Sequence, residues 1–355
     1  MDRRTFLALA LAPAARGTGG SELSPEKVRQ FEKLISVEMS RQSIPGLTMG
    51  LGLGDELRWS RGYGLADLEN FVPAKESTVY RTASLAKPMT ATAAMQLVEA
   101  GKLDLDAPVQ KYLPDFPAKR WPVTTRQLLS HTGGIRSYRD AAEEYNTRHY
   151  EDAREAMQQF AADELAYEPG TQYLYSSLGF VLAGAVIESI AGMRFSEYLR
   201  KNLFEPAEMR DTYLDDVYEL IPNRSRGYRR APNGRILNAV PIDTSNRAPG
   251  GGLASTPDDI VRFVFALPKL VKPESLTVMW RPQTTRDGRG TGYGLGWGVG
   301  EWQGRMRVDH HGGQSGVSTR LWFFPLDRAA IVAMGNLEGV SWDTLFEGVA
   351  QTLMG

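Results

Sequence analysis

The sequence predicts an α+β fold built on an antiparallel sheet flanked by helices. Near the N-terminus, two short apolar runs lie on either side of Gly54-Asp55, which is a hairpin signal. In the C-terminal third, four strand-like segments are separated by glycine or Pro-Leu-Asp turns. Between these two regions, apolar residues recur at helical spacing. The helices are therefore expected between two sheet-forming parts of the chain.

Composition and charge narrow the function classes. The 355 residues suffice for one large domain or two small ones. The formal net charge is −1 and no long basic run occurs, so neither nucleic acid nor an anionic membrane surface is an expected partner. The absence of cysteine excludes disulfides and thiolate catalysis. The four histidines have no zinc-site spacing, and we expect neither a metal nor another cofactor.

Residues 1–15 resemble an export signal. Arg3-Arg4 precedes an apolar run from Leu7 to Ala12, and Ala12-Pro13-Ala14 could be the cleavage site. The arginine pair followed by Phe6-Leu7 resembles a twin-arginine signal, so we expect export to a bacterial periplasm or secretion. A short disordered tail is the alternative. A Gly/Ser-rich linker is expected at 16–23, and no later stretch is apolar and long enough to span a membrane.

Capping residues and periodicity predict the helices. Ser24 followed by Pro25 predicts a helix from Ser24 to about Gln42, because serine caps helices and proline fits their first turn. A buried helix is expected from about Ser84 to Gly101. Further helices are expected at 124–130, over the charged stretch 138–165, after Ser176 or Ser177 as far as Gly192, after Thr256, and at 341–353.

The strands follow from alternation and turn residues. They are expected at 47–53, 57–63, 293–300, 305–309, 318–324 and 329–335. His310 and His311 lie between two of these segments. Adjacent residues on a strand point to opposite faces, so both histidines cannot line one pocket.

The pattern Ser84-Leu85-Ala86-Lys87 is the candidate catalytic motif. Residues three apart share a helix face, so the Lys87 amine can lie beside the Ser84 hydroxyl. A serine hydroxyl becomes nucleophilic when a base takes its proton, and burial favours the neutral lysine that can act as this base. The Ser84 N–H at a helix start is also free to donate to an oxyanion. A second S-x-x-K pattern, at Ser24, is explained by helix capping.

Other features could contribute to a site. Tyr175 directly precedes a buried helix, where its phenol can project into a cleft. His131 lies in a glycine turn and is either a site residue or, as we favour, a partner for backbone groups. The run Gly250-Gly251-Gly252 has neither a strand nor phosphate-loop spacing beside it, which argues against nucleotide binding.

The order of these motifs resembles that of the serine β-lactamase and penicillin-binding-protein superfamily, whose signature is S-x-x-K. The chain is most similar to the class C-type branch, and within it to the mitochondrial β-lactamase-like serine protease and its bacterial relatives. The resemblance runs from about residue 24 to the end. It is carried by Ile44-Pro45-Gly46, Ala100-Gly101-Lys102-Leu103-Asp104, Thr124-Thr125-Arg126-Gln127-Leu128-Leu129-Ser130-His131, Tyr173-Leu174-Tyr175-Ser176 and Gly250-Gly251-Gly252-Leu253.

This resemblance implies a β-lactamase/transpeptidase-like serine hydrolase domain at 24–355, with an all-helical subdomain at roughly 84–200 inserted between the sheet-forming parts. Ser84 is implied to be the acylated nucleophile and Lys87 its proton partner. Tyr175 matches the tyrosine of the family's Y-x-N motif, which shares acid and base duty with the lysine.

The family's third motif, K-T-G or H-x-G, is His310-His311-Gly312 in this sequence. The backbone N–H groups of Ser84 and Gly313 are implied to form the oxyanion hole. His310 and Gly312, together with Ser177, are the expected substrate-binding residues.

Two residues depart from the family pattern. Ser177 replaces an asparagine, and its hydroxyl cannot offer a carboxamide's donor and acceptor together. His310 replaces the lysine of penicillin-active members, so a permanent positive charge facing the substrate carboxylate is lost. Both changes argue against efficient β-lactam hydrolysis, but neither affects acyl transfer itself.

Two classes of function follow. The first is a serine hydrolase that cleaves a peptide, amide or ester through an acyl-enzyme on Ser84; a genuine β-lactamase or D-alanyl-D-alanine carboxypeptidase is an alternative within this chemistry. The second is a non-catalytic binding or assembly protein on the same fold. Ser84, Lys87 and Tyr175 together favour an enzyme with a small-molecule or peptide substrate, because a binding module does not need all three.

Overall fold

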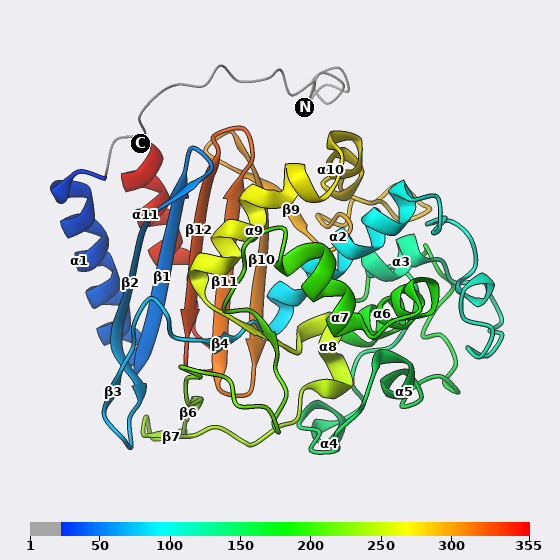
Figure 1. Ribbon diagram of the computed structural model, residues 1–355, viewed down its shortest axis with the longest axis horizontal. Helices are drawn as coiled ribbons and strands as arrows, with labels where there is room; N and C mark the ends of the chain where they lie inside the picture. The colour runs from blue at the N-terminus through cyan, green and yellow to red at the C-terminus, as the bar shows by residue number, and fades with distance from the viewer. Residues whose placement is uncertain (1–22) are drawn as a thin grey trace.

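A seven-stranded antiparallel sheet runs through the computed structural model, which describes residues 23–355 (Figure 1). From edge to edge its strands are β3 (Val72–Pro73), β2 (Glu56–Asp67), β1 (Gly46–Leu53), β12 (Ala329–Gly335), β11 (Val317–Phe324), β10 (Arg305–Gln314) and β9 (Gly298–Trp302). The N-terminal hairpin and the C-terminal strands thus join in one sheet. The predicted export signal and all but the last residue of the predicted linker lie outside the described residues.

The two ends of the chain meet where β1 pairs with β12. Leu47 lies opposite Gly335, and every residue of β12 is buried. The buried Asn336 side chain accepts a hydrogen bond from the Gly46 N–H at 2.8 Å and donates one to the Leu65 carbonyl at 3.0 Å. Asn336 therefore satisfies backbone groups of both hairpin strands at the end of this pairing.

Helices cover both faces of the sheet. The first and last helices, α1 (Pro25–Gln42) and α11 (Asp343–Met354), pack on one face, whereas α9 (Pro257–Leu270) lies on the other (Figure 1). At the start of α1, Ser24 Oγ accepts a hydrogen bond from the Lys27 N–H at 3.3 Å. The interpretation of Ser24 as a helix cap is confirmed.

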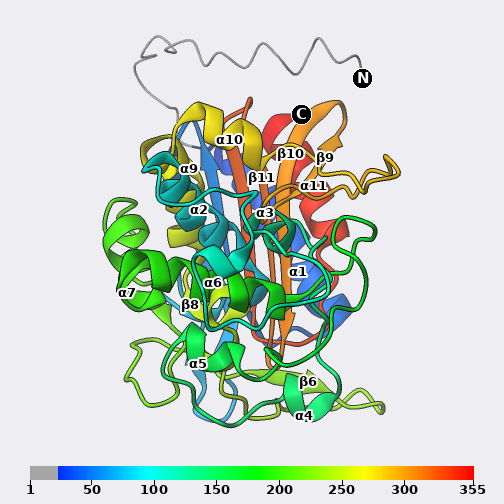
Figure 2. The same cartoon turned by 90° about the vertical axis from the view of Figure 1, so that its right-hand side faces the viewer.

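A helical region lies on the α9 side of the sheet, in front of β10 and β11 in Figure 2. Its helices are α2 (Ala86–Glu99), α3 (Thr125–Leu129), α6 (Ser177–Ala191), α7 (Phe195–Leu199), α8 (Ala248–Gly251) and α10 (Pro273–Met279). Short strands form two small sheets, one with the order β4 (Tyr80–Arg81), β8 (Leu253–Ser255), β5 (Tyr213–Leu214) and one of β6 (Tyr228–Arg230) with β7 (Ile236–Asn238).

The central helix α6 illustrates how local sequence sets the boundaries. Ser176 Oγ accepts a hydrogen bond from the Gly179 N–H at 3.1 Å, so Ser176 rather than Ser177 is the cap. Gly192 ends the helix with a φ of 66°. No single helix of residues 23–355 is apolar and long enough to cross a membrane; α6 and 195–204 meet those criteria only together, across a 75° bend.

The predicted helix at 138–165 is wrong. The stretch contains only α4 (Ala141–Glu144) and α5 (Ala153–Met157), and the chain around them is irregular. The side chains of Asp140 and Asp152 each accept a backbone hydrogen bond and start a new short helix. The charged residues thus stabilise separate turns instead of one long helix.

The prediction of a strand from Tyr293 is also wrong, because β9 begins only at Gly298. Gly292 and Gly296 have φ angles of 66° and 78°, which are incompatible with an extended strand. In contrast, β10 extends beyond its predicted end at Asp309 as far as Gln314, so the third family motif lies within a strand.

Candidate active site

Ser84 lies where β10 approaches the start of α2. A single turn of 3-10 helix, η2 (Ala83–Leu85), precedes α2, so helical structure begins near Ser84 as predicted, although the α-helix itself begins at Ala86. Ala83 has a φ of 47°, in the left-handed region that costs a non-glycine residue about 1–2 kcal/mol. After this strained turn, the Ser84 side chain is partly exposed while the residues that follow are buried.

The glycines of β10 explain how the strand reaches this turn. A Cβ on Gly312 would lie 2.3 Å from Thr319 Oγ1 and 2.8 Å from the Thr82 carbonyl oxygen, so a side chain there would push the strand away. A Cβ on Gly313 would meet open space. Because β9 pairs with β10 only as far as Asp309, Gly313 lies on a part of β10 that β9 does not cover. The oxyanion role of its N–H stays a prediction.

The Lys87 amine is fully buried and contacts three oxygens. Its Nζ lies 3.0 Å from Ser84 Oγ, 3.2 Å from Ser177 Oγ and 2.6 Å from the Gly250 carbonyl oxygen. The rings of Tyr175 and Phe180 lie over the amine, with centroids at 4.7 and 5.4 Å. Three separate segments of the chain therefore converge on one nitrogen.

This environment favours the neutral amine. Burial lowers the pKa of Lys87 well below its ordinary value, and the positive charge of Arg247 lowers the pKa further. A neutral amine has two N–H groups and one lone pair. The Gly250 carbonyl can only accept, and Ser177 Oγ can accept the second N–H. The lone pair is then left for the hydroxyl proton of Ser84, which is the arrangement that a general base requires.

Tyr175 is the third residue at this site, and its ring lies over the Lys87 amine. Burial raises the pKa of its phenol, and a hydrogen bond with Ser84 opposes that rise. The phenol therefore keeps its proton near neutral pH and can donate it. The structure thus brings Ser84, Lys87 and Tyr175 together, as the sequence motifs predict, although their catalytic roles stay predictions.

His131 contacts the segment that carries Tyr175. Its Nδ1 accepts a hydrogen bond from the Ser176 N–H at 3.1 Å, and its ring lies 4.2 Å from the Tyr175 ring, centroid to centroid. Burial, together with the nearby Lys87 and His310, lowers the pKa of His131 well below its ordinary value. His131 does bind a backbone group, but at Ser176 rather than in its own glycine turn, and its tilted ring lies beside that of Tyr175.

His310 is buried, and both of its ring nitrogens are occupied. Nδ1 lies 2.7 Å from the His311 carbonyl oxygen, which can only accept, so Nδ1 carries the proton. Nε2 lies 2.8 Å from the Tyr293 hydroxyl and must accept from it. Burial and the nearby Lys87 lower the pKa of His310 well below its ordinary value, so the imidazole is neutral. His311 is exposed on the other face of β10, as predicted.

The sequence analysis missed Tyr293 and the Gly250 carbonyl. The sequence shows the glycine run at 250–252, but it does not show which backbone carbonyl of the run binds a side chain. Tyr293 was placed on a predicted strand, whereas it lies in irregular chain that brings its buried hydroxyl to His310. Among residues 23–355, no group of three or more His, Asp or Glu side chains is arranged to hold a metal ion.

An antiparallel sheet with a helical region, and a serine beside a buried neutral lysine, define a β-lactamase/transpeptidase-like fold. A beta-lactamase family model matches residues 31–353. The chain belongs to the beta-lactamase family, which confirms both the resemblance and the fold class predicted from the sequence. The family and its relatives support a serine hydrolase in general terms.

Relatives from several organisms share this family. The human protein "Serine beta-lactamase-like protein LACTB, mitochondrial" is 30% identical, over 79% of this chain and 69% of its own length. Penicillin-binding protein 4* of Bacillus subtilis is 26% identical, over 89% of this chain and 73% of its own length. The octameric penicillin-binding protein homologue from Pyrococcus abyssi has a TM-score of 0.79 at 25% identity, covering 92% of this chain and 77% of that one.

The buried amine predicts a distinctive pH dependence of stability for Lys87→Met. The folded-state pKa of Lys87 lies well below the unfolded-state value. Between the two values the unfolded chain binds more protons, so wild-type stability rises with pH by up to about 1.4 kcal/mol per unit. Methionine does not titrate, and the variant is therefore expected to lose stability relative to wild type as the pH rises toward the ordinary lysine pKa of about 10.4.

Urea unfolding of both proteins across this pH range measures the difference. Lys33→Met, at an exposed position of α1, is the control and should show the wild-type pH dependence. Parallel curves for wild type and Lys87→Met would contradict the neutral, buried amine.

Proposed function

We propose that this protein is a serine hydrolase that cleaves a peptide, amide or ester through an acyl-enzyme on Ser84. The observation that carries the proposal is the position of the buried Lys87 amine, whose Nζ lies 3.0 Å from Ser84 Oγ. Lys87 takes the hydroxyl proton as Oγ attacks the acyl carbon. The N–H groups of Ser84 and Gly313 donate to the oxyanion.

Tyr175 completes the proton path in this proposal. Its phenol is protonated at rest and interacts with Ser84, so it can act on the group bonded to the same acyl carbon. It donates a proton to the leaving nitrogen or oxygen and recovers one from the lysine. In the second half-reaction, the same groups activate water against the acyl-enzyme.

One similar structure supports amide chemistry. The Streptomyces protein described as a D-stereospecific amidohydrolase has a TM-score of 0.74 at 25% identity, covering 90% of this chain and 97% of its own. The site has a neutral His310 where penicillin-active members have lysine, which supports a preference for substrates without an obligatory carboxylate.

Covalent labelling tests the nucleophile. A fluorophosphonate or aryl ester probe is expected to modify Ser84, and Ser84→Ala should abolish both labelling and turnover, because Ser84 Oγ lies 3.0 Å from the Lys87 Nζ. Ser24→Ala removes the serine of the second S-x-x-K pattern and should change neither. Peptide mapping by mass spectrometry identifies the modified residue. Labelling that persists in Ser84→Ala would exclude the assignment.

Tyr175→Phe tests the proton path. The change keeps the ring beside His131 and removes only the hydroxyl, so kcat/KM is expected to fall by roughly 10²- to 10⁴-fold. Tyr173→Phe is the matched control, since its ring also lies near His131 but its side chain is exposed. It should stay within a few-fold of wild type. The opposite order of effects would transfer the role to Tyr173.

Substrate preference can be measured as a ratio of kcat/KM values. The occupied nitrogens of His310 offer no charge to a penicillin or cephalosporin carboxylate, and a lost charge-assisted hydrogen bond costs roughly 10- to 150-fold. We expect short aryl esters and aminoacyl p-nitroanilides to be cleaved faster than a chromogenic cephalosporin, with Ser84→Ala as the blank. A cephalosporin value above those of the esters and amides would show that the protein is a β-lactamase.

A further inference from the structure

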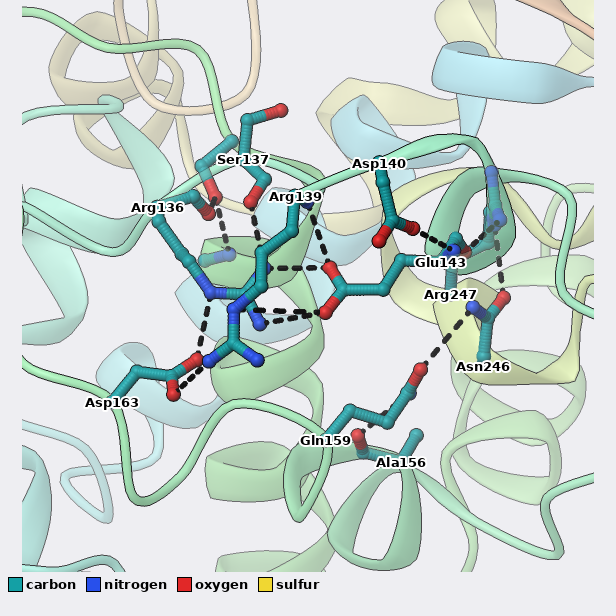
Figure 3. Close-up of polar contacts among 12 residues, drawn as sticks. Arg136, Ser137, Arg139, Asp140, Glu143, Ala156, Gln159, Asp163, Asn246 and Arg247 are labelled. Carbon is teal, nitrogen blue, oxygen red and sulfur yellow. Dashed lines mark hydrogen bonds and ion pairs between the residues drawn. The ribbon is translucent and has the colours of Figure 1, made fainter.

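Arg247 is a buried cation next to the candidate site. It lies directly before α8, the short helix whose Gly250 carbonyl binds the Lys87 amine, and only 4% of its surface is exposed. Its Nε donates to Asn246 Oδ1 at 2.9 Å, as Figure 3 shows. Its Nη2 donates to the backbone carbonyls of Glu143, at 3.3 Å, and Glu144.

All of these acceptors are neutral. Among residues 23–355, no carboxylate forms an ion pair with Arg247. The nearest acidic side chain in the network, Glu143, turns its carboxylate to Arg136 at 2.7 Å, and Asp163 pairs with the same arginine (Figure 3). An unneutralised buried charge costs several kcal/mol, so its position needs an explanation other than stability.

The guanidinium packs on a ring near the Lys87 amine. The Arg247 guanidinium carbon lies 4.6 Å from the centre of the Tyr138 ring. The buried Tyr138 hydroxyl lies near Ser177 but has no hydrogen-bond partner among the described residues. Ser177 Oγ is in turn 3.2 Å from the Lys87 Nζ. Burial is the larger cause of the low Lys87 pKa, and the charge of Arg247 lowers this pKa further. Burial raises the pKa of Tyr138, and the charge of Arg247 opposes that rise. Arg247 thus lies beside the site, three residues before the carbonyl that binds the amine.

We propose that Arg247 is a positioning residue whose unneutralised charge keeps the Lys87 amine in its neutral, proton-accepting form. This inference rests on the proposed serine hydrolase function. The other titratable groups around the amine are Tyr175, His131 and His310, and each is uncharged near neutral pH. Arg247 is therefore the charged group that adds to burial in favouring the neutral form of this base.

The charge of Arg247 also acts during formation of the acyl-enzyme. When Ser84 Oγ bonds to the acyl carbon, its proton moves to Lys87 and creates an ammonium group near the guanidinium. The repulsion between the two cations favours release of this proton through Tyr175 to the leaving nitrogen or oxygen, whose bond to the acyl carbon breaks. Lys87 is then neutral again and ready to activate water.

Two substitutions remove the charge by different routes. Arg247→Gln deletes it, and Asn246→Asp neutralises it with a nearly isosteric carboxylate at the atom that already lies 2.9 Å from Nε. Without the charge, the Lys87 pKa rises, so the acid limb of the kcat/KM profile for an aryl ester should move to higher pH. At a fixed pH on that limb, kcat/KM of the variants should be lower than that of wild type by roughly 3- to 30-fold. At pH values above the limb, the variants should match wild type.

Controls separate charge from structure. Arg247→Lys keeps the charge and should leave the acid limb of the kcat/KM profile near its wild-type position. Arg136→Gln breaks the neighbouring ion pairs with Glu143 and Asp163 but leaves Arg247 in place, so the limb should not move. Thermal unfolding of each variant reports whether it is folded, and Asn246→Asp provides the test if Arg247→Gln is not.

The outcomes are distinct. A shared upward shift in Arg247→Gln and Asn246→Asp, absent from Arg247→Lys and Arg136→Gln, supports the inference. An unmoved limb in folded Asn246→Asp, or an equal shift in Arg247→Lys, overturns it. If the wild-type protein shows no Ser84-dependent labelling, the proposed function itself fails, which is a different result from a labelled enzyme with an unmoved limb.

Discussion

The burial of one amine, that of Lys87, is the constraint on which the site depends. A lysine amine without water must find its hydrogen bonds within the protein. It does so with groups from η2, α6 and α8, and rings from Tyr175 and Phe180 close over it. Each of these segments is held by its own packing, so the amine is placed by the whole helical region rather than by its own helix alone.

The site combines several features that cost stability. Ala83 and His131 have positive φ angles of 47° and 59°, and the buried His131 Nε2 has no hydrogen-bond partner among the described residues. Arg247 adds a buried charge. Positive φ angles occur at non-glycine residues elsewhere as well, for example at Asp55 and Arg328 in turns. Near Ser84 they are combined with an unpaired buried ring nitrogen and a buried charge, a combination typical of a functional site.

Sequence reasoning succeeded where the chemistry is local. The cap at Ser24, the hairpin at Gly54-Asp55 and the spacing of Ser84 and Lys87 each depend on neighbouring residues, and the structure has them as predicted. The stretch 138–165 failed because Asp140 and Asp152 each start a new short helix. Arg154 also finds its partner, Asp115, 39 residues away.

The contacts of the site could not be read from the sequence for the same reason. The Tyr293–His310 hydrogen bond joins residues 17 apart, and the contact of Lys87 with the Gly250 carbonyl joins residues 163 apart. Periodicity and capping rules carry no information about such distant pairs. A family motif indicates that distant residues meet, but it does not show which atoms they use.

The pairing of β1 with β12 has a consequence for the order of events during synthesis. The N-terminal hairpin emerges from the ribosome long before residues 329–335, which complete its sheet. At about 5–20 residues per second, one edge of β1 stays without its partner strand for on the order of ten seconds or more. An apolar strand edge exposed for so long invites pairing with other chains. The nascent protein therefore depends on chaperones, or on a low local concentration, until its last tenth has been made.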